Sequence, residues 1–239
     1  MKIYLVRHGE SMGNIDKNVH HTTADHAISL SDNGKKQAFS AGLFLKNELK
    51  ENCRGEKVRI WTSPYRRTRQ TSKQIMKALG LKWNDYLDGT KPRMPSLQSK
   101  MSFKDIDISY REHTLLCEQQ FGLFDGLEDD ELQIKYPNEG AHYQKCMDQE
   151  GRFWARMPLG ESRFDVATRV HQAFGTFHRD CEKHNIKNII VVCHGVTLRA
   201  FVMQWLHYTP EWFDKEKNPS NCAIRGIDGN KDLGYLFKP

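Results

Sequence analysis

The sequence predicts an α/β protein: a three-layer α/β/α sandwich with a mostly parallel central sheet and an inserted cap region. Two observations lead to this fold class. Short apolar runs alternate with longer segments whose apolar residues recur every three or four positions, which is the pattern of strands alternating with helices. One late run, residues 188–193, is β-branched and apolar after its first residue, as is typical of a strand buried on both faces of a parallel sheet.

The first half of the chain supplies two strand–helix units. Lys2–Val6 is expected to form a strand, and Ser31 is expected to cap the helix that follows. Lys57–Thr62 is a second strand and Tyr65–Leu79 a second helix. The apolar positions of the first helix are Ala38, Ala41, Leu45 and Leu49.

The second half repeats the pattern. Ser162, with Asp165 three residues later, has the spacing of a helix cap of the capping-box kind. The strand at residues 188–193 follows, and Leu198–Leu206 reads as a further helix. The helix after Ser162 is strongly amphipathic, with apolar positions Ala167, Val170, Phe174, Phe177 and Cys181.

Between the two halves, Leu87–Gly160 breaks this rhythm with four prolines and many polar residues. We interpret it as an insertion or cap at about 87–160 over one end of the sheet, within a single domain that covers residues 1–239. Extra residues are expected around Lys91–Ser109. Substrate choice is expected to depend on this cap.

Composition narrows the class of protein. The chain has 239 residues, 38% hydrophobic and 28% charged, which is typical of a globular protein. No run approaches the ~18–20 apolar residues of a membrane span, and the short apolar start does not fit a signal peptide. We therefore expect a cytoplasmic protein with no membrane partner. The six cysteines form no Cys-x-x-Cys pair, so reduced thiols, several of them in the core, are favoured over disulfides.

The basic balance, a net charge of +6, raises the question of nucleic acid. Lysines and arginines are spread along the chain among acidic residues, and no nucleic-acid motif is present. A phosphorylated small molecule is therefore the simpler anionic partner. The sequence leaves open whether the protein forms an oligomer.

Two His-Gly pairs follow predicted strands. Arg7-His8-Gly9 comes directly after the first strand, and His194-Gly195 directly after the strand at 188–193. Ligands bind at the carboxyl ends of parallel strands, so both imidazoles would face one crevice if these two strands are neighbours. The backbone N–H groups near Gly195, at a helix start, could face an anion.

An arginine cluster follows the second strand. Arg66, Arg67 and Arg69 stand just after Ser63-Pro64, and the guanidinium group is suited to binding phosphate through paired hydrogen bonds. One of these arginines, together with Arg7 and the two histidines, would make a pocket for a phosphoryl group. Each motif alone is common, but their combination points to phosphoryl chemistry.

At these residues the sequence resembles the histidine phosphatase superfamily, in particular its plant and fungal phosphoglycerate-mutase-like proteins. Leu5–Ser11 matches the signature of that family, and Asn14 falls where its motif also has Asn. The resemblance continues over nearly the whole chain. Three further motifs match at Ser63–Thr71, Cys117–Gly122 and Val192–Gly195.

The resemblance implies a mechanism. His8 attacks phosphorus and carries the phosphate, Glu118 protonates the leaving oxygen and then serves as base for water, and its apolar neighbours favour the protonated acid. Neither a metal nor a cofactor is required. Arg7, Arg67 and His194 are implied to hold the phosphoryl oxygens, and the candidate substrate contacts are Asn14, Gly195, Arg156 and His21, although loop histidines are more often solvated.

The phosphate acceptor is the open question. The resemblance leads us to expect an Arg, a Tyr and a Lys after the catalytic Glu of a phosphoglycerate mutase, whereas this chain has Gln119, Gln120 and Phe121. We therefore expect a phosphomonoester hydrolase acting on a small phosphorylated metabolite. The alternatives are a cofactor-dependent phosphoglycerate mutase, with Arg152 and Arg156 replacing the missing basic residues, and an inactive module that binds phosphorylated ligands.

Overall fold

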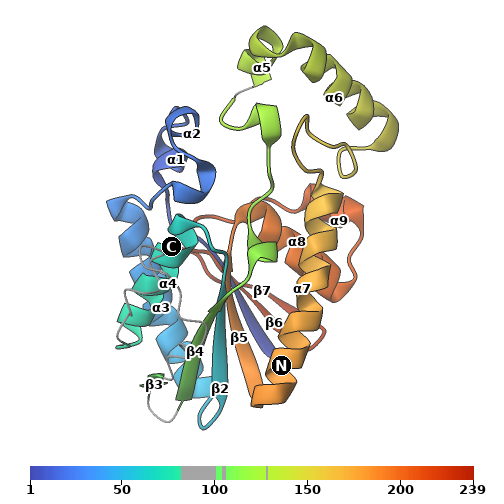
Figure 1. Ribbon diagram of the computed structural model, residues 1–239. Coiled ribbons are helices and arrows are strands. Elements are labelled where there is room, and N and C mark those ends of the chain that lie inside the picture. Colours follow the sequence, from blue (N-terminus) through green and yellow to red (C-terminus); the bar gives the residue numbers. More distant parts are fainter. Residues whose placement is uncertain (82–100, 104–105, 128) are drawn as a thin grey trace.

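The computed structural model describes residues 1–81, 101–103, 106–127 and 129–239 (Figure 1). Its centre is a seven-stranded sheet with the order β3-β4-β2-β5-β1-β6-β7. The strands are β1 Lys2–Arg7, β2 Lys57–Thr62, β3 Met101–Phe103, β4 Ile106–Glu112, β5 Ile186–Cys193, β6 Ile224–Asp228 and β7 Lys231–Phe237.

The four central strands, β4, β2, β5 and β1, run parallel to one another, and β3, β6 and β7 add antiparallel edges. Strand β5 lies between β1 and β2. Its register pairs Cys193 with Arg7 of β1, and Val192 with Thr62 of β2. The ends of three strands therefore lie side by side, and this arrangement positions the candidate site.

Helices cover both faces of the sheet, which confirms the predicted three-layer class (Figure 1). On one face lie α3 Asp32–Asn52 and α4 Arg66–Ala78, and on the other α7 Arg163–His184 and α8 Gly195–Leu206. The shorter helices are α1 Met12–Ile15, α2 Val19–Thr22, α5 Asp129–Lys135, α6 Pro137–Glu150, α9 Pro210–Lys215 and the 3₁₀ turns Asp25–Ala27, Thr114–Leu116 and Gly122–Phe124.

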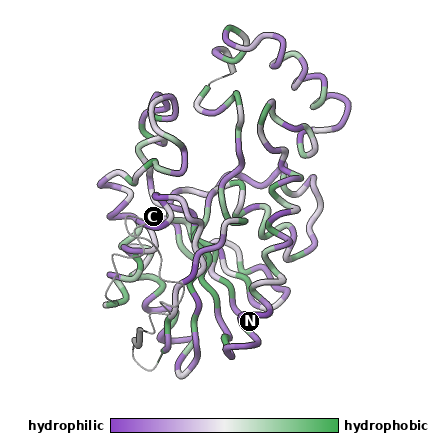
Figure 2. Tube along the Cα trace, in the orientation of Figure 1, coloured by the Kyte–Doolittle hydropathy of each residue, from purple (hydrophilic) through white to green (hydrophobic). Residues whose placement is uncertain are grey.

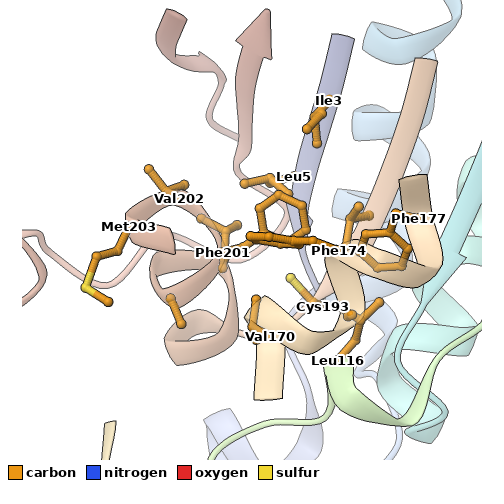
Figure 3. Close-up of a cluster of buried hydrophobic side chains, with 14 of the residues drawn as sticks. Ile3, Leu5, Leu116, Val170, Phe174, Phe177, Cys193, Phe201, Val202 and Met203 are labelled. Carbon is orange, nitrogen blue, oxygen red and sulfur yellow. The ribbon is translucent and has the colours of Figure 1, made fainter. Parts of the chain in front are cut away.

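Alternate residues of β1 supply the two halves of the core. Ile3 and Leu5 pack into the cluster beneath α7 and α8, while Tyr4 and Val6 pack into the cluster beneath α3 and α4. Figure 2 shows the hydrophobic residues concentrated along the central strands. The first cluster is rich in aromatic rings (Figure 3): the ring of Phe201 lies 4.8 Å from that of Phe174, between centroids.

Several predicted helix and strand ends are confirmed closely. Strand β2 has the expected bounds, and α4 differs from its prediction by one residue at each end. The predicted capping box of α7 is present, because Ser162 Oγ accepts the Asp165 N–H and the Asp165 carboxylate accepts the Ser162 N–H. Helix α8 begins at Gly195, three residues earlier than the apolar pattern indicated.

Strand β4 lies inside the range 87–160 that the sequence pattern assigns to a cap. Ile106, Ile108 and Tyr110 are buried on one side of it, and the residues between them are polar. This part of the range therefore belongs to the central sheet, and α5 and α6 form the projecting cap (Figure 1). Most of Lys91–Ser109, where extra residues are expected, lies outside the described residues. The β6–β7 hairpin was also not expected.

Two further observations bear on composition. Cys53, Cys181, Cys193 and Cys222 are buried, as expected for thiols in the core, and all six cysteines are free. In the part of the chain that the structure describes, no helix is both long enough and apolar enough to cross a membrane.

Candidate active site

The two His-Gly pairs meet at the carboxyl end of the sheet. His8 follows β1 and His194 follows β5, and these strands are neighbours, so the condition that the sequence left open is met. The His8 N–H donates to the Cys193 carbonyl (3.0 Å) and links the two loops. The ring centroids of His8 and His194 are 5.2 Å apart.

His8 is 4% exposed, and its Nδ1 lies 2.7 Å from the Gly9 carbonyl oxygen. A carbonyl oxygen only accepts, so Nδ1 carries the proton and the Nε2 lone pair is free. Burial, followed by the positive charges of Arg67 and Arg7, holds the pKa of His8 well below its usual value. The ring is therefore held as the neutral nucleophilic tautomer at neutral pH.

His194 is fully buried, with Nε2 2.9 Å from Ser63 Oγ. Its Nδ1 is also buried and has no hydrogen-bond partner among the described residues. A buried polar atom without a partner is costly, and here it is a position from which an oxygen of a ligand could be bound. Burial, followed by the charges of Arg67 and His8, lowers the pKa of His194.

Two arginines face the histidines. Arg67, in the first turn of α4, is 5% exposed, and its guanidinium donates to the Asp25 carboxylate (2.8 Å) and the Asp25 carbonyl (2.7 Å). Arg7 donates to the Pro219 carbonyl, and its Nε is buried without a partner among the described residues. Of the other two clustered arginines, Arg69 pairs with Glu112 at the end of β4 (2.8 Å).

Glu118 approaches the same place from the segment after β4. Its carboxylate accepts the Gln119 N–H at 3.0 Å and two N–H groups of the first turn of α8, from Thr197 at 3.3 Å and Val196 at 3.4 Å. The partial positive charge of a helix N-terminus favours an acidic group there. These bonds fix the carboxylate beside the two histidines.

Four of the predicted catalytic residues line one cavity of about 440 Å³, a volume suited to a small metabolite, whereas His194 is not among its lining residues. Arg7, His8, Arg67 and Glu118 all line it. Other residues that line it are Ser11, Gly13, Asn14, Lys17, His20, Asp25, Phe121, Phe124, Asp125, Gly126, Leu127, Val196 and Asn218.

The remaining substrate-contact predictions lie differently. Asn14 lines the cavity, whereas it is His20, and not the neighbouring His21, that reaches it. Gly195 lies close to Asn218, since a Cβ at residue 195 would lie 2.2 Å from Asn218 Oδ1. Arg156 is 66% exposed, pairs with Asp165 (2.6 Å) and lines a separate hollow beside α6.

Arg169 in α7 also supports the site, and the sequence did not predict this role. It donates to the carbonyls of Leu115 and Cys117 at 2.8 Å and of Glu118 at 3.0 Å, and it also pairs with Glu161 at 2.8 Å. Arg169 thus ties the segment that carries Glu118 to α7. A single arginine on an amphipathic helix gives no signal of this role. Within the described ranges, no three His, Cys, Asp or Glu side chains are grouped so as to hold a metal ion.

Most of this chain is similar in sequence to a known protein family. Residues 3–86 and 100–236 match the family model for the histidine phosphatase superfamily, branch 1. The unmatched residues overlap the extra residues expected at Lys91–Ser109.

Several curated proteins are similar to this chain in sequence, and solved structures have a similar fold. Phosphoglycerate mutase-like protein AT74 of Arabidopsis thaliana is 33% identical over 95% of this chain, which spans 64% of that protein's length. Broad-range acid phosphatase DET1 of Saccharomyces cerevisiae is 27% identical, with 99% of this chain and 88% of that protein covered. A mycobacterial glucosyl-3-phosphoglycerate phosphatase has a similar fold, with a TM-score of 0.63 at 19% identity, covering 95% of this chain and 92% of that chain.

Proposed function

The chain belongs to the histidine phosphatase superfamily, and from that premise we propose that it hydrolyses phosphomonoesters of small metabolites through a phosphohistidine on His8. The observation that carries the proposal is the pair of adjacent buried imidazoles, of which His8 lines one cavity together with Arg7 and Arg67. A phosphoryl group has three equatorial oxygens, and Arg7, Arg67 and the unpartnered Nδ1 of His194 supply donors for them.

In the first step, Nε2 of His8 forms a bond to phosphorus while the ester P–O bond breaks. The Gly9 carbonyl supports this step because it accepts a hydrogen bond from Nδ1–H and stabilises the positive charge that develops on the ring. Glu118 gives its proton to the leaving oxygen, so the alcohol departs neutral. A positioned general acid contributes typically ~10²–10⁴-fold to the rate.

In the second step, water attacks the phosphorus of the phosphohistidine. Glu118, now a carboxylate, accepts the proton of the water, and the N–P bond breaks to return neutral His8. The three N–H groups that Glu118 accepts hold its carboxylate in place for this second role. Inorganic phosphate and the alcohol are the products.

Hydrolysis is favoured over mutase chemistry by the residues after Glu118. Gln119 donates to the Glu161 carbonyl (2.8 Å), the Gln120 N–H donates to the Glu161 carboxylate (3.0 Å), and Phe121 lines the cavity. This segment therefore brings no cation to grip a phosphoglycerate during transfer. We therefore propose water as the phosphate acceptor.

The test is to treat the protein with a reactive phosphodonor, such as acetyl phosphate, and to quench it within one turnover. We expect about one phosphate per chain, labile in acid and stable in base. His8→Asn removes the nucleophile and keeps a side-chain N–H near the Gly9 carbonyl, so this variant should not label.

The matched control is His171→Asn, on the exposed side of α7, which should label as wild type does. Equal labelling of wild type and His8→Asn contradicts the phosphohistidine. A wild-type protein that fails to label and releases no phosphate, in a screen of sugar phosphates, phosphoglycerates, nucleotides and phosphopeptides, supports the inactive module instead. Isomerisation of 3-phosphoglycerate, primed with 2,3-bisphosphoglycerate, that outpaces phosphate release supports the mutase.

We further propose a cytoplasmic location. The support is the chemistry of the six free cysteines, because thiols persist in a reducing compartment.

A further inference from the structure

Positive and negative side chains are equal in number around the cavity. Among its described lining residues, the permanent cations are Arg7, Lys17 and Arg67, and the acidic residues are Asp25, Glu118 and Asp125. The phosphate to be transferred uses the two arginines, because they lie beside His8. Glu118 is the proton donor, so the permanent charges left around the leaving group are the two carboxylates of Asp25 and Asp125 and the single cation of Lys17.

Asp25 is held in this position by the fold. It belongs to the 3₁₀ turn Asp25–Ala27, and both its carboxylate and its backbone carbonyl accept from Arg67. Its side chain is 25% exposed, so the carboxylate is at the cavity wall and not in bulk water. A second anion of the substrate would meet this carboxylate before it reached Arg67.

Asp125 provides the second negative charge, on the opposite loop. His20 Nδ1 lies 3.3 Å from Asp125 Oδ1 and 4.0 Å from Asp25 Oδ1, so the imidazole bridges the two acids. The pKa of His20 is raised, above all by the neighbouring Asp125, as is expected beside two carboxylates. His20 is also closely confined, since a Cβ on Gly126 would lie 2.8 Å from its Cβ.

Apart from Lys17 and His20, the other described residues that line the cavity around the leaving group are uncharged. Phe121, Phe124 and Leu127 line the cavity beside Asp125. Apolar walls do not solvate a charge, so they strengthen the effect of the two carboxylates.

We propose that this cavity selects phosphomonoesters whose leaving group carries no second negative charge, and that Asp25 and Asp125 are the residues that impose the selection. The inference rests on the proposed function for the placement of the phosphate against His8. It predicts that polyol or sugar monophosphates are preferred over phosphoglycerates and bisphosphates, although some relatives are named for the latter compounds.

Binding tests this inference separately from catalysis. The His8→Asn protein is titrated with glycerol 3-phosphate and with 3-phosphoglycerate, which are similar in size and differ in a hydroxymethyl against a carboxylate group. We expect about tenfold weaker binding of 3-phosphoglycerate, the size of a repulsion between partly screened charges several ångströms apart. Equal binding of the two ligands, or tighter binding of 3-phosphoglycerate, overturns the selection.

The assignment to Asp125 is tested with Asp125→Asn, which keeps the shape of the side chain. The ratio of kcat/KM for glycerol 3-phosphate to that for 3-phosphoglycerate should fall several-fold. Asp148→Asn, which removes an acidic charge from α6 outside the cavity lining, should leave this ratio unchanged. An equal fall in both variants would show a general effect of net charge and would overturn the assignment.

The same ratio is measured with Asp25→Asn as a second variant, so that misfolding of one does not decide the matter. Selective binding by His8→Asn without phosphate release by wild type would leave the selection standing and would contradict only the hydrolase. Phosphate release with no preference between the two esters, together with equal binding, would contradict only the selection.

Discussion

Arg169 lies outside the cavity lining and holds the segment that carries Glu118. Its guanidinium binds three backbone carbonyls of the segment 115–118 and the Glu161 carboxylate at once. A planar group with five donors can do this, and an ammonium group cannot reproduce the geometry. The position of the Glu118 carboxylate therefore depends on α7 as well as on its own segment.

Replacing Arg169 should impair the chemical step more than the binding of substrate. For Arg169→Met we expect kcat to fall by about 10- to 100-fold with a smaller change in KM, because a general acid displaced by about 1 Å loses this much. Arg169→Lys should restore only part of the loss. Steady-state kinetics measure both parameters.

Arg179→Met is the matched control, since Arg179 lies on the same helix and, among the described residues, its guanidinium donates a hydrogen bond to Thr176 alone. It should leave both parameters near those of wild type. A fall in kcat that is the same for Arg169→Met and Arg179→Met would mean that disturbance of α7, and not the position of Glu118, is responsible.

At the scale of elements, the loop after β1 crosses the first turn of α3 at very short distance. A Cβ on Gly34 would lie 2.0 Å from the Glu10 carbonyl oxygen, and a Cβ on Gly9 would lie 2.4 Å from the Gly34 carbonyl oxygen. Ser31 strengthens the crossing, because its hydroxyl accepts the Gly34 N–H and donates to Glu10 at 2.6 Å. The loop that contains His8 is thus held against the start of a long helix.

Two Gly→Ala substitutions within helices should therefore have opposite signs. Alanine normally stabilises a helix interior by about 1 kcal/mol relative to glycine. Gly175→Ala in α7 should do so, since only the flexible end of Arg179 is close. Gly34→Ala should instead lower the free energy of unfolding by about 1–3 kcal/mol, because its Cβ meets backbone. Urea denaturation measures both, and stabilisation by Gly34→Ala would disprove the crossing.

The local sequence pattern explains which helices and strands could be predicted and which could not. Helix α7 was predictable because its apolar residues follow one face over five turns and Ser162 marks its start. Strand β4 was missed because its buried residues alternate with polar ones inside a segment dominated by prolines and charges. Strands β6 and β7 were not predicted because Gly226 and Gly234 interrupt their apolar pattern.

For the whole molecule, the cap and the body differ in how they are packed. Helix α6 of the cap buries only Gly140, whereas α7 of the body buries eight residues. Elements with few buried contacts open locally at low free-energy cost. Helix α6 is therefore expected to open locally more readily than α7.

Hydrogen exchange should reveal this difference. Backbone amides in the central turns of α6 should exchange about 100-fold or more faster than those of α7 under native conditions. Mass spectrometry of peptides from residues 137–150 and 163–184 gives the comparison, with α3 as a second buried reference. Protection of α6 equal to that of α7 would contradict the loose packing of the cap.

The site residues at the ends of the central strands could be predicted from the sequence, whereas those of the outer wall could not. His8, His194, Arg7 and Arg67 follow strand ends or begin a helix, so their convergence is a consequence of parallel strands that are neighbours. The outer wall depends on long-range contacts, such as that between His20 and Asp125, which no local pattern encodes. Arg156 was expected at the substrate and lies instead in an exposed ion pair, because the path of the cap is not specified by periodicity.

The position of β5 in the sheet determines when the site can form during synthesis of the chain. Strands β1 and β2 do not pair with each other, because β5 lies between them, and β5 is synthesised some 120 residues after β2 has emerged. Until then, His8 has no partner strand on that side and the arginine of α4 has no fixed relation to it. On the proposed mechanism, a nascent or truncated chain that lacks β5 is therefore not expected to form the phosphohistidine, and this reactivity would begin only when the sheet is completed.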